Sequence, residues 1–476
     1  MKVTIYASPT NKKTILDLAE EQGISLPCNC HGANACGGRL YDFPCGMIPN
    51  HDMTVSIPER TILKEINGIS LEVSLSQGMS ANCILIDLGT TTVSMIFYNT
   101  DTHTTLHSTT FPNPQRTYGT DVISRIKYDV EFHTDYTLKK RICDEITNQF
   151  EIFHSSHPDL KIETCLIGGN TTMIHLLLGF PLDGMTGTPF TPYPAKQWRY
   201  HYKDTEIVIL PWLSAFIGGD ITAGLLCLDF DRRLDTCLLA DLGTNGELAL
   251  LHQGILYTAS TAAGPAFEGG GLSCGCPAIS GAIADFEWNR IMPKLKTIQN
   301  KLPIGICGSG AISILSELIR CGLLQENGTL AETFPTDGLP ICNTATKNPI
   351  IFTAKDVRQM QLAVAAIGAG IDTLCIKAGI STQHINSVYL AGSFGHHISI
   401  KKAIVTGLFS DVGISRIFPA GNTCLRGLAA IAGNRSELSE RTDCLKSMCH
   451  ETDLAGNDYF EQRFIQHMTY KSISTL

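Results

Sequence analysis

The sequence predicts an α/β protein whose core is built from two similar halves. Residues 83–99 contain four apolar residues that lead into Asp87, a Gly-Thr-Thr-Thr turn, and a β-branched apolar run that leaves the turn. Residues 237–250 repeat the order Cys, aliphatics, Asp, Leu, Gly, Thr around Asp241. Each pattern is typical of a buried strand, a tight turn and a second strand. Each half also has a later apolar strand that ends in glycine before a helix, at residues 165–175 and 388–396, so the duplication extends beyond the hairpins.

The hairpin turns carry residues suited to phosphate binding. Gly89 allows a ligand to approach the backbone closely, and the hydroxyls of Thr90 and Thr91, with nearby N–H groups, can bind phosphate oxygens. Asp87 can hold Mg²⁺ through water or orient an attacking water. The alternative is an ordinary hairpin whose Asp and Thr residues satisfy the turn. The second copy around Asp241 favours nucleotide binding.

Composition limits the classes of protein that remain. The chain has 476 residues, which predicts two or three domains. A net charge of −9 argues against an extended nucleic-acid surface. Residues 362–380 are apolar but include Asp372 and Lys377, which favours a buried helix over a membrane span. The N-terminus has no signal-peptide pattern, and the 18 cysteines lie mostly within apolar runs, so we expect a cytoplasmic protein with reduced thiols.

Three motifs together resemble the superfamily of acetate and sugar kinases, heat-shock chaperones and actin (ASKHA). They are Asp87-Leu-Gly-Thr-Thr, Asp241-Leu-Gly-Thr-Asn-Gly-Glu and Leu390-Ala-Gly-Ser-Phe-Gly, which are similar to its first phosphate, second phosphate and adenosine motifs. Four further motifs resemble one branch, the ATP-dependent reductive activators of corrinoid proteins: Gly119-Thr-Asp-Val-Ile-Ser-Arg-Ile, Gly168-Gly-Asn-Thr-Thr-Met, Gly264-Pro-Ala-Phe-Glu-Gly-Gly and Cys307-Gly-Ser-Gly. The resemblance implies an actin-like and sugar-kinase-like ATPase core with a small α+β ferredoxin-like N-terminal domain.

The resemblance implies a role for each matched residue. Asp87 and Asp241 would position Mg²⁺ and water. The phosphates of ATP would lie against the residues of the two hairpin turns, namely Gly89, Thr90, Thr91, Gly243 and Thr244. Gly392, Ser393 and Gly395 would border the adenosine, and Glu268, in a glycine-rich segment, is a candidate for the ribose hydroxyls.

The N-terminal segment combines a strand, a helix and a glycine-rich cysteine loop, which resembles a ferredoxin fragment. Cys30 and Cys36 keep the interval of the family, but Arg39 occupies the next ligand position, and Cys45 resembles the downstream ligand. Cys28 can replace the missing ligand. Three interpretations remain open: a 2Fe-2S cluster on these four cysteines, a zinc or other metal site, and a segment that binds no metal.

The resemblance implies a function. The leading hypothesis is ATP-dependent reduction of a corrinoid protein of a methyltransferase system from Co(II) to Co(I), with electrons from a low-potential donor relayed through the N-terminal cluster. Because Co(I) is hard to reach with ordinary donors, ATP would change the coordination or exposure of the corrin. The alternatives are a small-molecule kinase of the same superfamily and a regulatory paralogue that binds ATP without a redox role. A homodimer is compatible with the sequence.

We expect five segments along the chain. These are a shortened 2Fe-2S ferredoxin-like domain at 1–60, a linker at 61–81, the first ASKHA half at 82–235, the second at 236–433, and a C-terminal tail at 434–476 packed on the core. Residues 180–212, rich in Pro, Gly and aromatics, are expected to form an irregular insertion.

Smaller expectations concern single side chains. Arg116 and Arg125 can reach phosphate or a partner, but a solvated surface position is favoured. Asp220 either caps the helix after Gly218-Gly219 or faces the nucleotide metal, with capping favoured. Thr353 is expected to cap the long helix that runs through residue 376.

Overall fold

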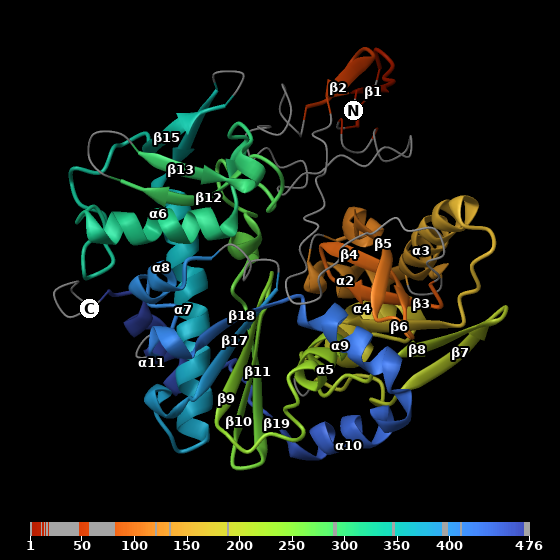
Figure 1. Ribbon diagram of the computed structural model, residues 1–476. Coiled ribbons are helices and arrows are strands. Elements are labelled where there is room, and N and C mark those ends of the chain that lie inside the picture. The colour runs from red at the N-terminus through yellow and green to blue at the C-terminus, as the bar shows by residue number, and fades with distance from the viewer. Residues whose placement is uncertain are drawn as a thin grey trace.

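The computed structural model describes the chain from residue 2 to residue 470, with gaps (Figure 1). The described residues are 2–10, 12–13, 15, 18, 47–56, 81–119, 121–132, 135–187, 190–288, 293–344, 348–392, 398–409 and 412–470. Several expected positions lie outside them: Cys28, Cys30, Cys36, Cys45, linker residues 61–80, Ser393 and Gly395.

The first half is built on a mixed sheet. Its strands, in spatial order, are β5 (Thr104–Pro112), β4 (Thr92–Asn99), β3 (Cys83–Leu88), β6 (Thr164–Gly169), β8 (Thr205–Ile209) and β7 (Trp198–Tyr202). The strand β3 pairs antiparallel with β4 and parallel with β6, which pairs parallel with β8. The helices of this half are α2 (Val122–Phe132), α3 (Thr137–Ser156), α4 (Thr171–Leu178) and α5 (Gly219–Cys227). Because both faces of β3 are covered, its apolar run Cys-Ile-Leu-Ile is buried throughout.

The second half is built on a sheet of the same kind. Its strands, in spatial order, are β18 (Ile417–Gly421), β17 (Ser387–Ala391), β9 (Cys237–Leu242), β10 (Gly246–His252), β11 (Ile255–Thr261) and β19 (Cys449–Glu451). Its helices are α6 (Gly308–Arg320), α7 (Ala354–Lys377), α8 (Ile400–Val405) and α9 (Thr423–Gly433), followed by α10 (Leu438–Met448) and α11 (Asp458–His467). Smaller sheets are formed by β12 (Ala282–Glu287), β13 (Lys294–Thr297) and β14 (Gly305–Ile306), and by β15 (Leu339–Asn343) and β16 (Pro349–Phe352).

The two large sheets share one topology, as the repeated hairpins predict. The strands β3, β4, β5, β6 and β8 correspond in order to β9, β10, β11, β17 and β18. Asp87 lies in register with Gly168 of the neighbouring parallel strand, and Asp241 lies in register with Ala391. The helices α5 and α9, which follow the corresponding strands β8 and β18, pack against each other between the sheets (Figure 1). The duplication therefore places both hairpins, and the N-termini of α5 and α9, in one region between the two halves.

The long helix α7 lies in the core of the second half. It begins with the expected cap, because the Thr353 hydroxyl accepts from the Asp356 N–H and the Asp356 carboxylate accepts from the Thr353 N–H. Its length and hydropathy would allow a membrane span, but 78% of its apolar window is buried within the protein. The helix α11 packs along it, so α7 is a core helix.

The described part of the N-terminal segment contacts the second half. The strands β1 (Lys2–Ile5) and β2 (Met53–Ser56) pair antiparallel. Ile5, Ile15 and Leu18 join an apolar cluster with Cys276 and Ala284, among other residues. Burial of these side chains fastens the N-terminus to the region around β12 and β14.

The expectation of an irregular insertion at 180–212 was wrong for its second part. Residues 198–209 form the antiparallel pair β7 and β8, and β8 extends the main sheet in parallel with β6. The proline and glycine residues before Trp198 dominated the composition of the window and obscured the short β-branched run Thr-Glu-Ile-Val-Ile of β8.

Candidate nucleotide site

The tips of the two hairpins meet where the two halves face each other. The hydroxyl oxygens of Thr91 and Thr244 are 3.5 Å apart. Gly89 is required by the first tip, because a Cβ there would lie 2.5 Å from the carbonyl oxygen of Thr92. At Gly243 the nearest atom found around such a Cβ is Glu268 Oε1 at 3.4 Å, an ordinary van der Waals contact, so the second tip is less tightly packed at this point than the first.

The first tip is clamped from behind by side chains of its own half. Asn113 Nδ2 donates to the carbonyl of Gly89 at 2.9 Å, and Arg125 Nη2 donates to the carbonyl of Thr90 at 2.7 Å. The N–H of Asn113 donates to the carbonyl of Thr91 at 3.0 Å. Because N–H and C=O point in opposite directions across a trans peptide, the N–H groups of this tip point away from the clamp. Such a row of N–H groups is suited to an anion.

The expected surface position of Arg125 was wrong. Its side chain is fully buried, and it donates to the carbonyl of Gly119 and to Met173 Sδ in addition to Thr90. Burial, with a smaller effect of the Arg116 charge, lowers the pKa of Arg125 to about 9. Sequence pattern does not predict such burial, because two of the three acceptors, Thr90 and Met173, lie in distant segments.

Four carboxyl groups face one another at the base of the tips. Asp87 and Asp241 lie on β3 and β9, Asp220 lies in the first turn of α5, and Glu247 of β10 is opposite Asp241 in the strand register. Burial raises the pKa of Asp87. Burial and the charge of Asp87 raise the pKa of Asp220 to about 7. Burial and the charges of Asp220, Asp87 and Glu268 raise the pKa of Asp241 to about 8. Burial, Asp220 and Asp241 raise the pKa of Glu247 well above its usual value.

The favoured capping role of Asp220 was therefore wrong. The N-cap of α5 is Gly218, and no side chain forms a cap hydrogen bond there; Asp220, in the first turn, accepts from the N–H of its neighbour Ile221. The Asp220 carboxyl instead belongs to the acidic cluster. Glu247 was not singled out by the sequence, although the Glu that follows Asp-Leu-Gly-Thr-Asn-Gly is the signal that would identify it.

The acidic cluster fits a hydrated Mg²⁺. Oxygen ligands suit this ion, and it usually keeps several waters while binding one or two carboxylates and substrate phosphates. Among the described residues no group of three or more His, Cys, Asp or Glu side chains has the geometry to hold a metal by itself. That Asp87 holds Mg²⁺ through water or orients an attacking water stays a prediction from the sequence.

The helix α9 contributes two residues that the sequence missed. Asn422 Nδ2 donates to Asp87 Oδ2 at 2.6 Å, while its Oδ1 accepts from the N–H of Leu425 as the N-cap of α9. The Cys424 thiol also hydrogen-bonds to the Asp87 carboxyl. A sequence signal for Asn422 exists: Gly421-Asn-Thr at the end of β18 repeats the Gly169-Asn-Thr that precedes and begins α4.

Glu268 lies at the hairpin tips. Its Oε2 accepts from Thr244 Oγ1 at 2.8 Å and from Thr91 Oγ1 at 3.2 Å. Gly392 has a φ of 89°, and a Cβ there would lie 2.9 Å from Asp241 Oδ1. Gly392, expected to border the adenosine, thus lies close to Asp241 of the second hairpin.

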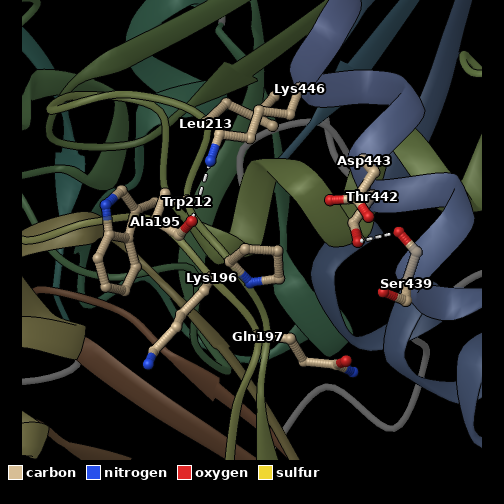
Figure 2. A pocket seen from close by; sticks show the side chains of 10 residues that line it. Ala195, Lys196, Gln197, Trp212, Leu213, Ser439, Thr442, Asp443 and Lys446 are labelled. Carbon is tan, nitrogen blue, oxygen red and sulfur yellow. Dashed lines mark hydrogen bonds between the residues drawn. The ribbon is translucent and has the colours of Figure 1, made fainter.

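A separate cavity of about 280 Å³ lies between residues 195–213 and α10 (Figure 2). Lys446 Nζ donates to the carbonyl of Ala195 at 3.0 Å across it, and the Trp212 indole forms part of its wall. None of its lining residues belongs to the hairpin tips or the acidic cluster. The cavity is therefore separate from the candidate nucleotide site.

Two duplicated halves that meet at paired Asp-Leu-Gly-Thr hairpins over an acidic cluster define a protein of the ASKHA class. Residues 235–475 match the family described as the C-terminal domain of RACo, the ASKHA domain, and residues 83–233 match the RACo middle region. The chain belongs to this RACo family, as the sequence motifs indicate.

Relatives and solved structures agree with this assignment. The corrinoid activation enzyme RamQ of Eubacterium limosum is 33% identical over 361 residues, covering 69% of this chain and 60% of the relative. The [Co(II) methylated amine-specific corrinoid protein] reductase of Methanosarcina barkeri is 28% identical over 303 residues, covering 58% of this chain and 54% of the relative. The chain thus spans little more than half the length of either relative in these matches. A solved structure of a reductive activator for corrinoid, iron-sulfur protein has a TM-score of 0.75 at 24% identity, covering 99% of this chain and 78% of that one, which shows a shared fold.

Proposed function

We propose that this protein uses ATP to drive the reduction of a corrinoid protein from Co(II) to Co(I), for a methyltransferase system. The observation that carries the proposal is the acidic cluster at the base of the two hairpin tips, in a chain whose relatives are named for corrinoid activation and corrinoid reduction. The partner would be the corrinoid protein, and the electron would come from a low-potential donor.

The residues of the cleft suggest a division of roles. The N–H groups of the first tip, turned outward by Asn113 and Arg125, would bind phosphate oxygens. Gly243 and Thr244 would lie against the same phosphates from the second half, and Gly392, Ser393 and Gly395 would border the adenosine. Asp87 and Asp241 would hold Mg²⁺ through water, which would neutralise charge as the phosphates react.

Closure of the two halves would couple the binding of ATP to a change in the bound corrinoid protein. Asp87 belongs to the first half, whereas Asn422 and Cys424, which contact it, belong to the second. A nucleotide that draws Asp87 and Asp241 together would also move the surfaces attached to each half. Such a movement could change the exposure or coordination of a bound corrin.

The iron-sulfur relay remains a proposal from the cysteine pattern. A 2Fe-2S cluster on Cys28, Cys30, Cys36 and Cys45 would accept electrons at the N-terminal segment. The apolar contacts of Ile5, Ile15 and Leu18 with the second half would hold that segment on the ATPase core. We also propose a cytoplasmic location, since all described cysteines are free thiols.

The proposed function is tested by measuring ATP hydrolysis in the presence of different candidate partners and substrates. Release of phosphate from ATP should rise when a Co(II) corrinoid protein is added, and should not respond to sugars or short carboxylic acids. Stimulation by a sugar or carboxylic acid with formation of its phosphate ester would instead establish a small-molecule kinase.

A further inference from the structure

The Glu268 carboxylate joins the hairpin tips of both halves. One of its oxygens, Oε2, accepts from Thr244 of the second half at 2.8 Å and from Thr91 of the first half at 3.2 Å. The two hydroxyl oxygens are themselves 3.5 Å apart. Three side chains from separate loops therefore converge on one point between the tips.

Each of these two hydroxyl groups already donates its only hydrogen to Glu268. A threonine hydroxyl has one hydrogen to donate and two lone pairs that accept. Because Thr91 and Thr244 both donate to Glu268, neither hydroxyl can also donate to a phosphate oxygen in this arrangement. Each can still accept a hydrogen bond, for which a water molecule is a suitable donor. The phosphate oxygens would then be bound by backbone N–H groups.

The backbone around Glu268 is fixed by close contacts. Gly269 has a φ of 78°, and a Cβ there would lie 2.2 Å from the carbonyl oxygen of Cys276. A Cβ at Gly308, in the first turn of α6, would lie 1.9 Å from the carbonyl oxygen of Phe267. Phe267 itself is 2% exposed. The carboxylate is thus carried on a rigid support, as a preorganised catalytic group requires.

The charges around Glu268 set it apart from the acidic cluster. Burial raises its pKa, whereas the hydrogen bonds from Thr244 and Thr91 and the charge of Arg116 lower it. Arg116, expected at a solvated surface position, thus acts on a carboxylate of the opposite half. Glu268 has a cation and two hydroxyl donors near it, whereas the charges acting on Asp241 come from other carboxyl groups.

We propose that Glu268 orients the water that attacks the terminal phosphate of ATP, and that Thr91 and Thr244 place it there when the halves are closed. This inference rests on the proposed function. The water oxygen forms a bond to the terminal phosphorus, the bond from that phosphorus to the bridging oxygen breaks, and ADP leaves with the electron pair. The proton of the water passes to Glu268 and then to the released phosphate.

The central variant is Glu268→Gln, which keeps the size of the side chain but cannot take the proton. We expect phosphate release to fall at least about 100-fold, while the Kd for ATP, measured by calorimetry, stays within about threefold of the original. Thr91→Val and Thr244→Val should each slow hydrolysis about tenfold with little change in the Kd. Glu287→Gln, at the exposed end of β12, is the matched control and should change neither quantity. Thermal unfolding checks that each variant is folded.

Other outcomes separate this inference from its rivals. Hydrolysis by Glu268→Gln within threefold of the original protein would overturn it while leaving the proposed function intact. A large loss of affinity for ATP in this variant, with no such loss for 2′-deoxy-ATP, would contradict the inference. It would show that Glu268 binds the ribose hydroxyls, as expected from the sequence. An original protein that binds no ATP would overturn both the inference and the proposed function.

Discussion

Asn422 of the second half donates a hydrogen bond to Asp87 of the first half at 2.6 Å. The same amide side chain accepts from the N–H of Leu425 and so caps α9. One residue therefore fixes the helix that packs between the sheets and orients a carboxylate of the acidic cluster. Orienting partners of this kind typically change activity by 10- to 100-fold when they are removed.

Asn422→Asp separates the two contributions of this residue. An aspartate caps a helix as well as an asparagine does, but it would place a negative charge beside Asp87. We expect ATP hydrolysis to fall at least tenfold. The cap of α9 is kept, but repulsion between the two carboxylates should lower the unfolding temperature at pH 8. Asn457→Ala removes the cap of α11, far along the chain, and should cost about 1 kcal/mol without an effect on hydrolysis.

Asp241→Asn should stabilise the protein while it abolishes turnover. The folded-state pKa of Asp241 is raised to about 8, so the original protein loses stability relative to the variant as pH rises from about 4 towards 8. We expect the variant to unfold at a higher temperature at pH 8, by about 1–3 kcal/mol in free energy, and the gain to shrink at pH 5. Equal unfolding temperatures at pH 8 would contradict the repulsion that the cluster implies.

Arg125→Met tests the clamp behind the first hairpin. The variant would leave the carbonyls of Thr90 and Gly119 without their buried donor, which should cost about 2–4 kcal/mol. Because the tip would lose its fixed orientation, the Kd for ATP should rise about tenfold. Arg141→Met, at an exposed position of α3, provides the comparison and should leave the Kd unchanged.

A second stability prediction concerns the C-terminal helix α11. Arg463 Nε and His467 Nε2 bind the Asp372 carboxylate of α7 at 2.6 and 2.8 Å. These partners lower the pKa of Asp372 despite its burial, so their stabilisation is present above about pH 4 and is lost as pH falls through the lowered pKa. Hydrogen exchange should show α11 opening first in acid, and Asp372→Asn should show this opening already at pH 7.

The duplicated fold could be predicted because its signals are local. The run Cys-Ile-Leu-Ile-Asp-Leu-Gly-Thr specifies a buried strand and a tight turn by itself, and its repeat at residue 237 specifies the second half. The remaining errors concern side chains whose surroundings come from distant segments. Arg125 donates to Thr90 and Met173, and the charge of Asp87 on another strand acts on Asp220.

The contacts of Glu268 were similarly hidden from the sequence. Its glycine-rich segment predicted a close approach to a ligand, but not which ligand group. Only the meeting of Thr91 and Thr244, which are separated by 153 residues, shows that the carboxylate lies at the hairpin tips. In contrast, the cap of α7 needs only Thr353 and Asp356, which are three residues apart, and was correctly predicted.

The most direct test of the central claim follows the cobalt by visible absorption under anaerobic conditions. A Co(II) corrinoid protein of a methyltransferase system is mixed with this protein and a low-potential chemical reductant, and MgATP is then added. The account predicts that the Co(I) spectrum grows only after ATP is added, and that Asp241→Asn abolishes this growth. Formation of Co(I) at the same rate without ATP, or no Co(I) from any corrinoid protein of such systems despite ATP hydrolysis, would contradict it.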